Sequence, residues 1–261
     1  MQAALWDRLS LAQLYLDRTN TRLDLDRSQV ENFYLPLAAQ LIGFSHNTPR
    51  LMVAIAGPPG SGKTAFGMIL VATINAIAEA EIAITIGLDG WHFPSQILLN
   101  RYLEVDEETR PLISLKGIPE SFDAQAAYAC FTEICNGGEV RYPIYNRLLH
   151  DPEPRAGLVR SSDKIIVIEG NYLLLAESPW QNFQDIFAVR IFINADPQSL
   201  LESLAERHLR GGKTPEDTFK HIQEVDLPNA QRILTGSPDA HIIVHKRDPK
   251  YIVHIEWVNG T

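Results

Sequence analysis

One run of residues has the types and spacing of a phosphate-binding loop. The pattern GxxxxGK[ST], the Walker A motif, is met in full by the run Gly57, Pro58, Pro59, Gly60, Ser61, Gly62, Lys63 and Thr64. Glycines let the backbone fold around phosphate oxygens, and the dipole of a following helix favours the same negative charge. We predict that Lys63 contacts the β- and γ-phosphates of a nucleotide and that Thr64 binds Mg²⁺.

Two carboxylates follow apolar runs elsewhere in the chain. Asp89 ends the run IAITIGLD (82–89), and Glu169 stands near the end of KIIVIEG (164–170). Parallel strands place their carboxyl ends at one edge of a sheet, so we expect both acids beside the loop, in a position to hold the metal. The alternative for each is that it only caps a strand or a turn.

The elements that position these residues alternate between strand and helix. Apolar runs at 51–57, 82–89, 164–170, 187–194 and 240–246 are typical of strands buried on both faces. Helical patterns lie at 63–80, 123–136, 197–210 and 215–234. The alternation predicts an α/β fold with a doubly wound, mainly parallel sheet flanked by helices. Residues 1–48 are predicted to form a helical arm that packs on the P-loop domain at 49–261.

Composition narrows the class of protein. A net charge of −9 over 261 residues argues against a protein that coats nucleic acid or an anionic membrane. Two cysteines make no disulfide framework. The N-terminal residues lack a signal-peptide pattern, so the expected location is cytoplasmic. An NKxD motif for guanine is absent from the sequence, which favours ATP over GTP.

Four further stretches carry a family resemblance. They are LDGWHFP (88–94), KGIPESFD (116–123), VRYPIYNRLLHDP (140–152) and VIEGNYLLL (167–175). With the loop, they resemble the superfamily of uridine kinase, phosphoribulokinase and type I pantothenate kinase. ENFYLPLAAQL (31–41) is similar to the helix that precedes the core in pantothenate kinases. At finer level the chain resembles bacterial proteins of which some are labelled fructose-transport-system kinases.

The resemblance implies an enzyme and assigns roles to the two acids. It implies a P-loop fold, ATP with Mg²⁺, and phosphoryl transfer to a hydroxyl of a small metabolite such as a pantothenate-like compound, a sugar or a nucleoside. Asp89 matches the base that accepts the proton of the attacking hydroxyl, and Glu169 matches the acid that holds Mg²⁺. The alternatives are a nucleotide-binding regulator without efficient transfer and a hydrolytic P-loop NTPase.

The resemblance also implies an acceptor site. Its candidate residues are His92, Phe93, Arg141, Tyr145, Arg147 and His150. His92 is equally interpreted as a turn residue that bonds its own backbone, and Tyr145 as an aromatic packed beneath the loop. Uridine kinases carry an aspartate where this chain has Asn146, which changes the hydrogen bonds offered to a nucleoside.

A basic helix end at 202–214 resembles the family's lid. Arg207 and Arg210 are predicted to close over the phosphates, because guanidinium binds phosphate oxygens at two points. The other interpretation is a solvated helix end that favours its own dipole. Asn229 is assigned to the adenine, or alternatively to a helix kink, since Pro228 requires the helix to break or restart. The expected partner is a small-molecule substrate, with no nucleic acid or membrane, and the arm makes a homodimer conceivable.

Overall fold

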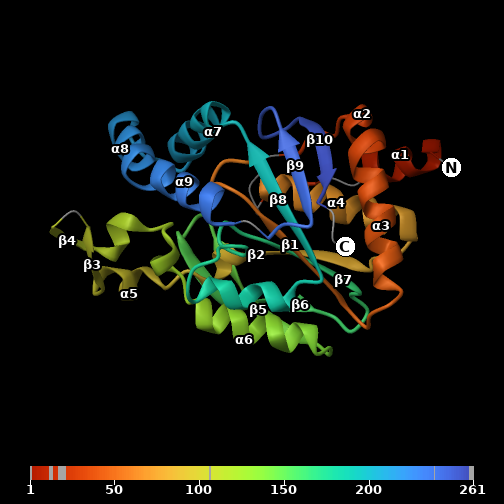
Figure 1. The fold of residues 1–261 in the computed structure, drawn as a ribbon, viewed down its shortest axis with the longest axis horizontal. Coiled ribbons are helices and arrows are strands. Elements are labelled where there is room, and N and C mark those ends of the chain that lie inside the picture. Colours follow the sequence, from red (N-terminus) through yellow and green to blue (C-terminus); the bar gives the residue numbers. More distant parts are fainter. Residues whose placement is uncertain (1, 12–13, 17–21, 106, 238, 259–261) are drawn as a thin grey trace.

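A six-stranded sheet forms the centre of the computed structural model, which describes residues 2–11, 14–16, 22–105, 107–237 and 239–258 (Figure 1). The strand order is β10-β9-β8-β1-β7-β2. The strands are β1 (Leu51–Ala56), β2 (Ala83–Gly87), β7 (Ile165–Glu169), β8 (Val189–Ala195), β9 (Ile242–Lys246) and β10 (Ile252–Trp257). All pair in parallel except β10, which is antiparallel to β9. The predicted mainly parallel α/β sheet is confirmed.

The central strands are continuously apolar because both faces of the sheet are covered. Alternate residues of β1 point to opposite sides: Met52 and Ala54 join one hydrophobic cluster, whereas Val53 and Ile55 join another. All residues of β1 and β7 are buried. Burial on both faces explains why these strands appear as continuous apolar runs in the sequence. The loops after the strands meet at one edge because the strands run parallel.

The face with Val53 and Ile55 is covered by α4 (Lys63–Ala78) and by the N-terminal segments. These are α1 (Gln2–Leu11), α2 (Arg27–Gln29), the π-helical η2 (Val30–Tyr34) and α3 (Leu35–Ser45). The rings of Tyr34 and Phe66 lie 5.2 Å apart, and Leu37 and Leu41 share the α4 cluster. The N-terminal segments therefore pack on α4 and on the sheet itself, where the side chain of Gln29 accepts from the backbone N–H of Ile252 in β10. The division of the chain at residue 48 stays a prediction.

The opposite face carries α6 (Ala124–Cys135) and short elements that the sequence did not indicate, which share one hydrophobic cluster. These are the hairpin β5 (Val140–Asn146)/β6 (Asp151–Val159) and the 3-10 turns η3 (Leu88–Trp91) and η6 (Trp180–Ile186). The helix α5 (Ser95–Leu99), the hairpin β3 (Tyr102–Val105)/β4 (Glu108–Pro111) and the 3-10 turn η4 (Leu112–Leu115) form a smaller cluster around Leu98, and the 3-10 turn η5 (Pro119–Ser121) follows them in the chain. Arg50 anchors this side, because its buried guanidinium donates to the carbonyls of Ile134, Gly138, Arg160 and Asp163.

The C-terminal helices form a separate group above the carboxyl ends of the strands (Figure 1). They are α7 (Pro197–Arg210), α8 (Pro215–His221), the π-helical η7 (Ile222–Asp226) and α9 (Leu227–Gly236). The predicted helix at 215–234 contains the π-helical segment η7, and Pro228 directly follows it, in the first turn of α9. The backbone remains helical at Ile222, Asp226 and Leu227, so the π-helical turn takes the place of the break or restart that we expected at Pro228. No helix in the described part of the chain is long and apolar enough to cross a membrane.

Candidate active site

The loop between β1 and α4 is shaped by its glycines. Gly60 and Gly62 have φ of 80° and 77°, in the left-handed region that favours glycine. A side chain at Gly62 would also meet the carbonyl oxygen of Pro249 at 2.3 Å, so the loop is held from outside. Lys63 begins α4 and donates from Nζ to the carbonyl of Pro58 at 2.9 Å. Burial lowers the pKa of Lys63 to about 8.

Thr64 and Glu169 meet at the end of the neighbouring strand. The Thr64 hydroxyl donates to Glu169 Oε1 at 3.0 Å, and Glu169 is buried at the last position of β7. Both side chains offer hard oxygen atoms, the ligands that Mg²⁺ prefers. The buried Ser61 hydroxyl, in the loop itself, has no hydrogen-bond partner among the described residues. These groups fit a metal-bound phosphate: Thr64 and Glu169 on the metal side and the loop on the anion.

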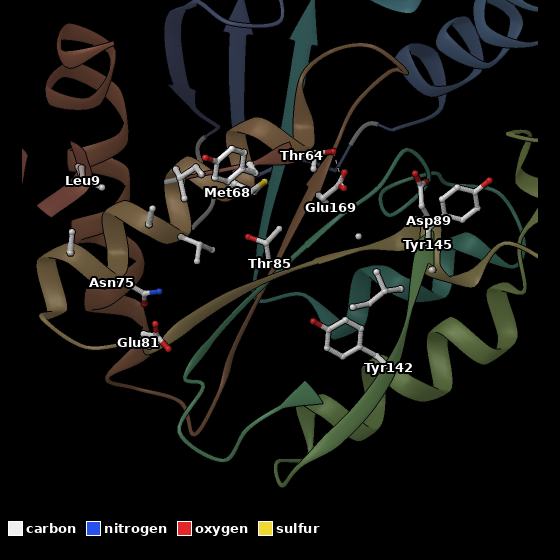
Figure 2. A pocket seen from close by; sticks show the side chains of 18 of the residues that line it. Leu9, Thr64, Met68, Asn75, Glu81, Thr85, Asp89, Tyr142, Tyr145 and Glu169 are labelled. Atoms are coloured by element: carbon white, nitrogen blue, oxygen red, sulfur yellow. Dashed lines mark hydrogen bonds between the residues drawn. The ribbon is translucent and has the colours of Figure 1, made fainter. Parts of the chain in front are cut away.

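Asp89 stands in η3, directly after β2, and is paired with Arg147. The distance from Asp89 Oδ2 to Arg147 Nη2 is 2.8 Å. Burial alone would raise the pKa of Asp89, but the charge of Arg147 and of other nearby cations lowers it below its usual range. Asp89 is therefore ionised at neutral pH. The structure brings the two predicted acids and Thr64 to the wall of one pocket of about 900 Å³ (Figure 2).

Tyr145 lies between two cations on the acceptor side of that pocket. The ammonium of Lys116 is 5.1 Å from its ring centre and the guanidinium of Arg147 is 5.4 Å away. Lys116 also donates to the carbonyl of His150 at 2.6 Å and lies 3.7 Å from Asp151. Burial, with the charge of Asp89, raises the pKa of Tyr145 to about 12. Tyr145 is therefore a neutral hydroxyl at physiological pH.

His92 makes the hydrogen bond that the turn interpretation requires. Its Nδ1 lies 2.9 Å from the carbonyl oxygen of Asp89, and its ring packs at a tilt against Phe122 with centres 3.8 Å apart. Burial lowers the pKa of His92, which favours the neutral ring. Its contact with an acceptor stays a prediction.

The other candidates of the acceptor segment lie farther out. The guanidinium of Arg101 lies over the ring of Phe93, 4.0 Å from the ring centre, and Phe93 packs in a small apolar cluster around Leu98. Arg141 is exposed and its closest polar contact is the carbonyl of Arg155 at 3.5 Å. The side chain of His150 is exposed at a hairpin turn. None of these three lines the pocket.

Asn146 has a structural task that its comparison with uridine kinases did not suggest. Its side-chain oxygen accepts from the backbone N–H groups of Leu148 and Leu149, and its Nδ2 donates to Glu153 at 2.8 Å. The amide therefore shapes the turn between β5 and β6. We expected it to change the hydrogen bonds offered to an acceptor, but its described bonds all go to the hairpin.

The lid candidates are tied to Asp226. Arg207 Nη2 lies 3.4 Å from Asp226 Oδ1, and His208 Nε2 lies 2.6 Å from Asp226 Oδ2. The charge of Arg207 contributes to lowering the pKa values of both Lys63 and Asp89, which places it within electrostatic reach of the pocket. Arg210 is exposed, 3.9 Å from Glu206. The roles of both arginines at the phosphates stay predictions.

One cluster near Asp226 has the donor types of a metal site. Ligand atoms of His208, His221 and Asp226 lie within 4.8 Å of one another. Burial, followed by the charge of Lys213, lowers the pKa of His221 to about 4. Cations on this side, Arg207 and Lys213, oppose a bound metal ion, so we interpret the cluster as a tether between α7 and η7.

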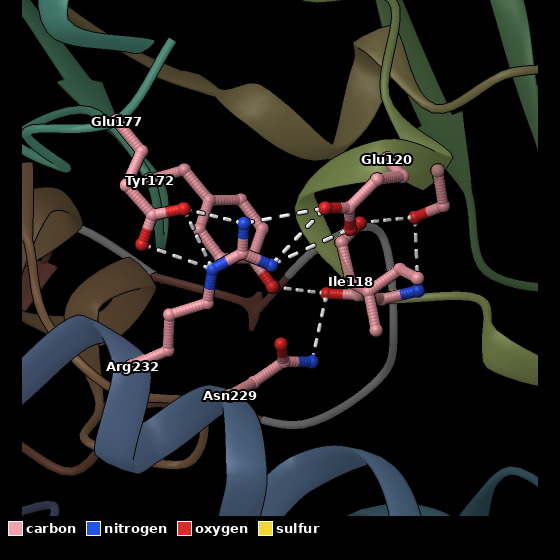
Figure 3. Close-up of polar contacts among 8 residues, drawn as sticks. Ile118, Glu120, Tyr172, Glu177, Asn229 and Arg232 are labelled. Carbon is pink, nitrogen blue, oxygen red and sulfur yellow. Dashed lines mark hydrogen bonds and ion pairs between the residues drawn. The ribbon is translucent and has the colours of Figure 1, made fainter. Parts of the chain in front are cut away.

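Asn229 contacts the KGIPESFD stretch. Its Nδ2 lies 3.4 Å from the carbonyl of Gly117, which also accepts from the Tyr172 hydroxyl (Figure 3). One turn further along α9, Arg232 bridges Glu177 and Glu120, at 2.5 and 3.2 Å. These bonds raise the pKa of Arg232 above its usual value. The helix α9 is thus fastened to the KGIPESFD stretch, and adenine binding by Asn229 stays a prediction.

Two lysines were missed by the sequence analysis. Lys116 belongs to a stretch quoted only for its resemblance. Lys246 ends β9 and is buried beneath the loop, donating to the carbonyls of Ser61, at 3.1 Å, and Pro249. Burial lowers the pKa of Lys246 to about 7. A lysine that ends an apolar strand at the same sheet edge as the loop was the available signal.

The fold and this arrangement define a P-loop small-molecule kinase. The model of the Phosphoribulokinase / Uridine kinase family matches residues 52–203, more than half of the chain, and the chain belongs to this family.

Relatives agree with this assignment. An uncharacterized Escherichia coli protein, YggC, is 28% identical over 89% of this chain and 94% of its own length. A pantothenate kinase of Myxococcus xanthus is 28% identical over 71% of this chain and 63% of its own length. A solved structure described as a "putative fructose transport system kinase" from Silicibacter sp. TM1040 is 27% identical, covers 79% of this chain and 96% of its own, and has a TM-score of 0.70.

Proposed function

We propose that this chain transfers the γ-phosphoryl group of ATP, with Mg²⁺, to a hydroxyl group of a small metabolite. The observation that carries the proposal is the meeting of Thr64, Glu169 and Asp89 in one pocket at the end of the phosphate-binding loop. A kinase needs a charged phosphate cradle and a base that faces the same space, and these three side chains with Lys63 supply both.

The residues divide the work between donor and acceptor. The loop N–H groups and Lys63 bind the phosphates, and Thr64 and Glu169 would hold Mg²⁺, which neutralises phosphate charge when it is bound. Asp89, ionised and held in place by Arg147, accepts the proton of the attacking hydroxyl. Since Arg147 sits next to this carboxylate, it also orients an acceptor whose oxygen approaches Asp89.

The lid residues complete the proposal. Arg207 is released from Asp226 when it turns toward the phosphates, and its fork then stabilises charge on the transferred group. Closure of the helices around it excludes water and limits hydrolysis of ATP.

The proposed test is a screen for ATP consumption against pantothenate, common sugars and sugar acids, and nucleosides, with Mg²⁺ present. Acceptor-dependent release of ADP in the wild type, absent in Asp89→Asn, is the expected result. ATP binding without stimulation by any acceptor would contradict the proposal and favour a nucleotide-binding regulator.

A further inference from the structure

The pocket that holds Asp89 at one end continues well past Thr64 and Glu169, along α4 and away from the phosphate-binding loop (Figure 2). Its middle is lined by Met68, Val71 and Ala72 of α4, opposite Tyr142 and Ile144 of β5. Its far end reaches Leu9, Leu14 and Tyr15 of the N-terminal segments. We call this extension, beyond Thr64 and Glu169, the α4 channel.

The size of the pocket exceeds what a phosphate and a small alcohol require. Ligand pockets commonly measure about 300–1,000 Å³, and this one, at about 900 Å³, lies at the upper end. A metal-bound γ-phosphate would use only the part beside Thr64 and Glu169. The remaining length, from Ile144 and Tyr142 to the N-terminal segments, is open to a ligand that starts at Asp89 and passes this part on the side of β5.

The walls of the channel select against charge. The residues of its middle are apolar or carry an uncharged hydroxyl, as Thr85 and Tyr142 do. At the far end Arg8 is paired with Glu79 at 2.8 Å, and Glu81 stands exposed nearby. An anionic group would therefore meet net negative charge there, and any charged group would lose its water in the middle.

The channel is preformed. The hairpin that makes one wall touches the Asp89 loop so closely that a side chain on Gly90 would meet the carbonyl oxygen of Pro143 at 2.2 Å. The ring of Tyr142 lies directly on Gly157, where a methyl group would meet it at 2.3 Å. Thr85, from edge strand β2, adds a buried hydroxyl that has no partner among the described residues.

We propose that the acceptor carries an extended, uncharged and mostly apolar arm, which lies in the α4 channel while the reacting hydroxyl faces Asp89. The proposal rests on the proposed kinase function and names its substrate class. A free sugar, a sugar acid or a nucleoside leaves the apolar walls in contact with water, so this part of the pocket adds no binding free energy for such an acceptor. An alcohol linked through an amide or ether to an alkyl-like chain buries apolar surface along the whole chain and gains binding free energy from it.

The test is two series of alcohols, one for each of two head groups, in which the alkyl tail increases in length. Pantothenate is compared with its N-propyl, N-pentyl and N-heptyl amides, and glucose with the alkyl glucosides of the same chain lengths. With the head group that reacts, kcat/KM is expected to rise about threefold to fourfold per methylene until the channel is filled. The measured quantity is the ratio of kcat/KM for heptyl and propyl acceptors.

A channel-filling variant locates the effect. Ala72→Phe is expected to bring the heptyl-to-propyl ratio close to one, because the new ring occupies the middle of the channel. Ala129→Phe, the same change at an exposed position of α6, is the matched control and is expected to keep the wild-type ratio. Calorimetric binding of the same amides and glucosides to the wild type gives a second measure if Ala72→Phe does not fold.

The outcomes separate the two proposals. Affinity that grows with tail length without phosphorylation of any alcohol supports the channel and refutes the kinase function. Phosphorylation with no dependence on tail length overturns the channel proposal and leaves the kinase intact. A dependence that persists unchanged in Ala72→Phe, or the absence of both binding and turnover across the series, also overturns it.

Discussion

The phosphate-binding loop and the acceptor side of the pocket face the same space but are built by different means. The loop is one continuous segment, shaped by glycines at positive φ and enclosed by buried neighbours. The acceptor side assembles Asp89, Lys116, Tyr145 and Arg147 from three separate segments, and ion pairs and ring contacts hold it together. The donor site is thus set by backbone conformation and the acceptor site by long-range side-chain contacts.

This difference between the donor site and the acceptor side indicates where acceptor specificity can change without loss of the fold. A backbone cradle binds any triphosphate, and a substitution in it disturbs packing on several sides, as the close contact of Gly62 with Pro249 indicates. Partly exposed groups such as Arg147 can be replaced at little cost to the core. We therefore expect substitutions in the loop to abolish turnover and those on the acceptor side to alter it selectively.

The largest effect is expected for Lys63→Ala. Loss of the buried ammonium removes the charge that faces the β- and γ-phosphates, so turnover should fall by at least about 10³-fold, and ATP binding should weaken. Steady-state kinetics and ATP titration measure both, with the exposed Lys164→Ala as control. Full turnover in Lys63→Ala would refute the donor site.

Asp89→Asn should separate the two sides of the pocket. An amide cannot take the hydroxyl proton, so kcat is expected to fall about 10²–10⁴-fold while ATP affinity stays nearly unchanged. Asp185→Asn, an exposed acid on η6, serves as the matched control. If turnover hardly changes, Asp89 only positions the acceptor and the assignment of the base is wrong.

Arg147→Ala is expected to have a smaller effect, confined to the acceptor side. Removal of this charge-assisted contact should raise the acceptor KM about 10- to 100-fold and leave the KM for ATP unchanged. Since Arg147 helps to lower the pKa of Asp89, its loss should also shift the acidic limb of the pH–rate profile to higher pH. The exposed Arg155→Ala on β6 is the control, and an unshifted acidic limb would contradict the pairing.

The sequence predicted what local patterns encode. The five parallel strands were found because burial on both faces makes them apolar runs, and the loop because its motif is contiguous. Asp89 and Glu169 could be placed at one edge because parallel strands point the same way. These predictions needed no knowledge of which strands are neighbours.

What the sequence could not provide depends on contacts between distant segments. The hairpins β3/β4 and β5/β6 are short and half-exposed, so their alternation is weak, and Arg141 was grouped with Tyr145 only by proximity in the chain. The link of Asn229 to Gly117 joins positions far apart in the sequence. Lys246 was missed for the same reason, because its role exists only where β9 passes beneath the loop.

The smallest effect on turnover, and a distinct effect on stability, is expected for Lys246→Met. The pKa of Lys246 lies at about 7 in the folded protein against 10.5 in the unfolded chain, so the unfolded chain binds more protons between these values. This difference makes the free energy of unfolding rise with pH across that window, by about 2 kcal/mol between pH 7 and 9. Methionine abolishes this part of the rise, and loss of the bond to Ser61 should raise the KM for ATP a few-fold.

Urea unfolding at pH 7 and at pH 9 gives the change in the free energy of unfolding for the wild type and for the variant. Comparing the two changes cancels the similar contribution of Lys63, which both proteins carry. The exposed Lys250→Met, on the same turn, should keep the wild-type slope. Equal slopes in Lys246→Met and the wild type would mean that Lys246 does not lie buried under the loop, and the outside support of the donor site would then have to come from Pro249 alone.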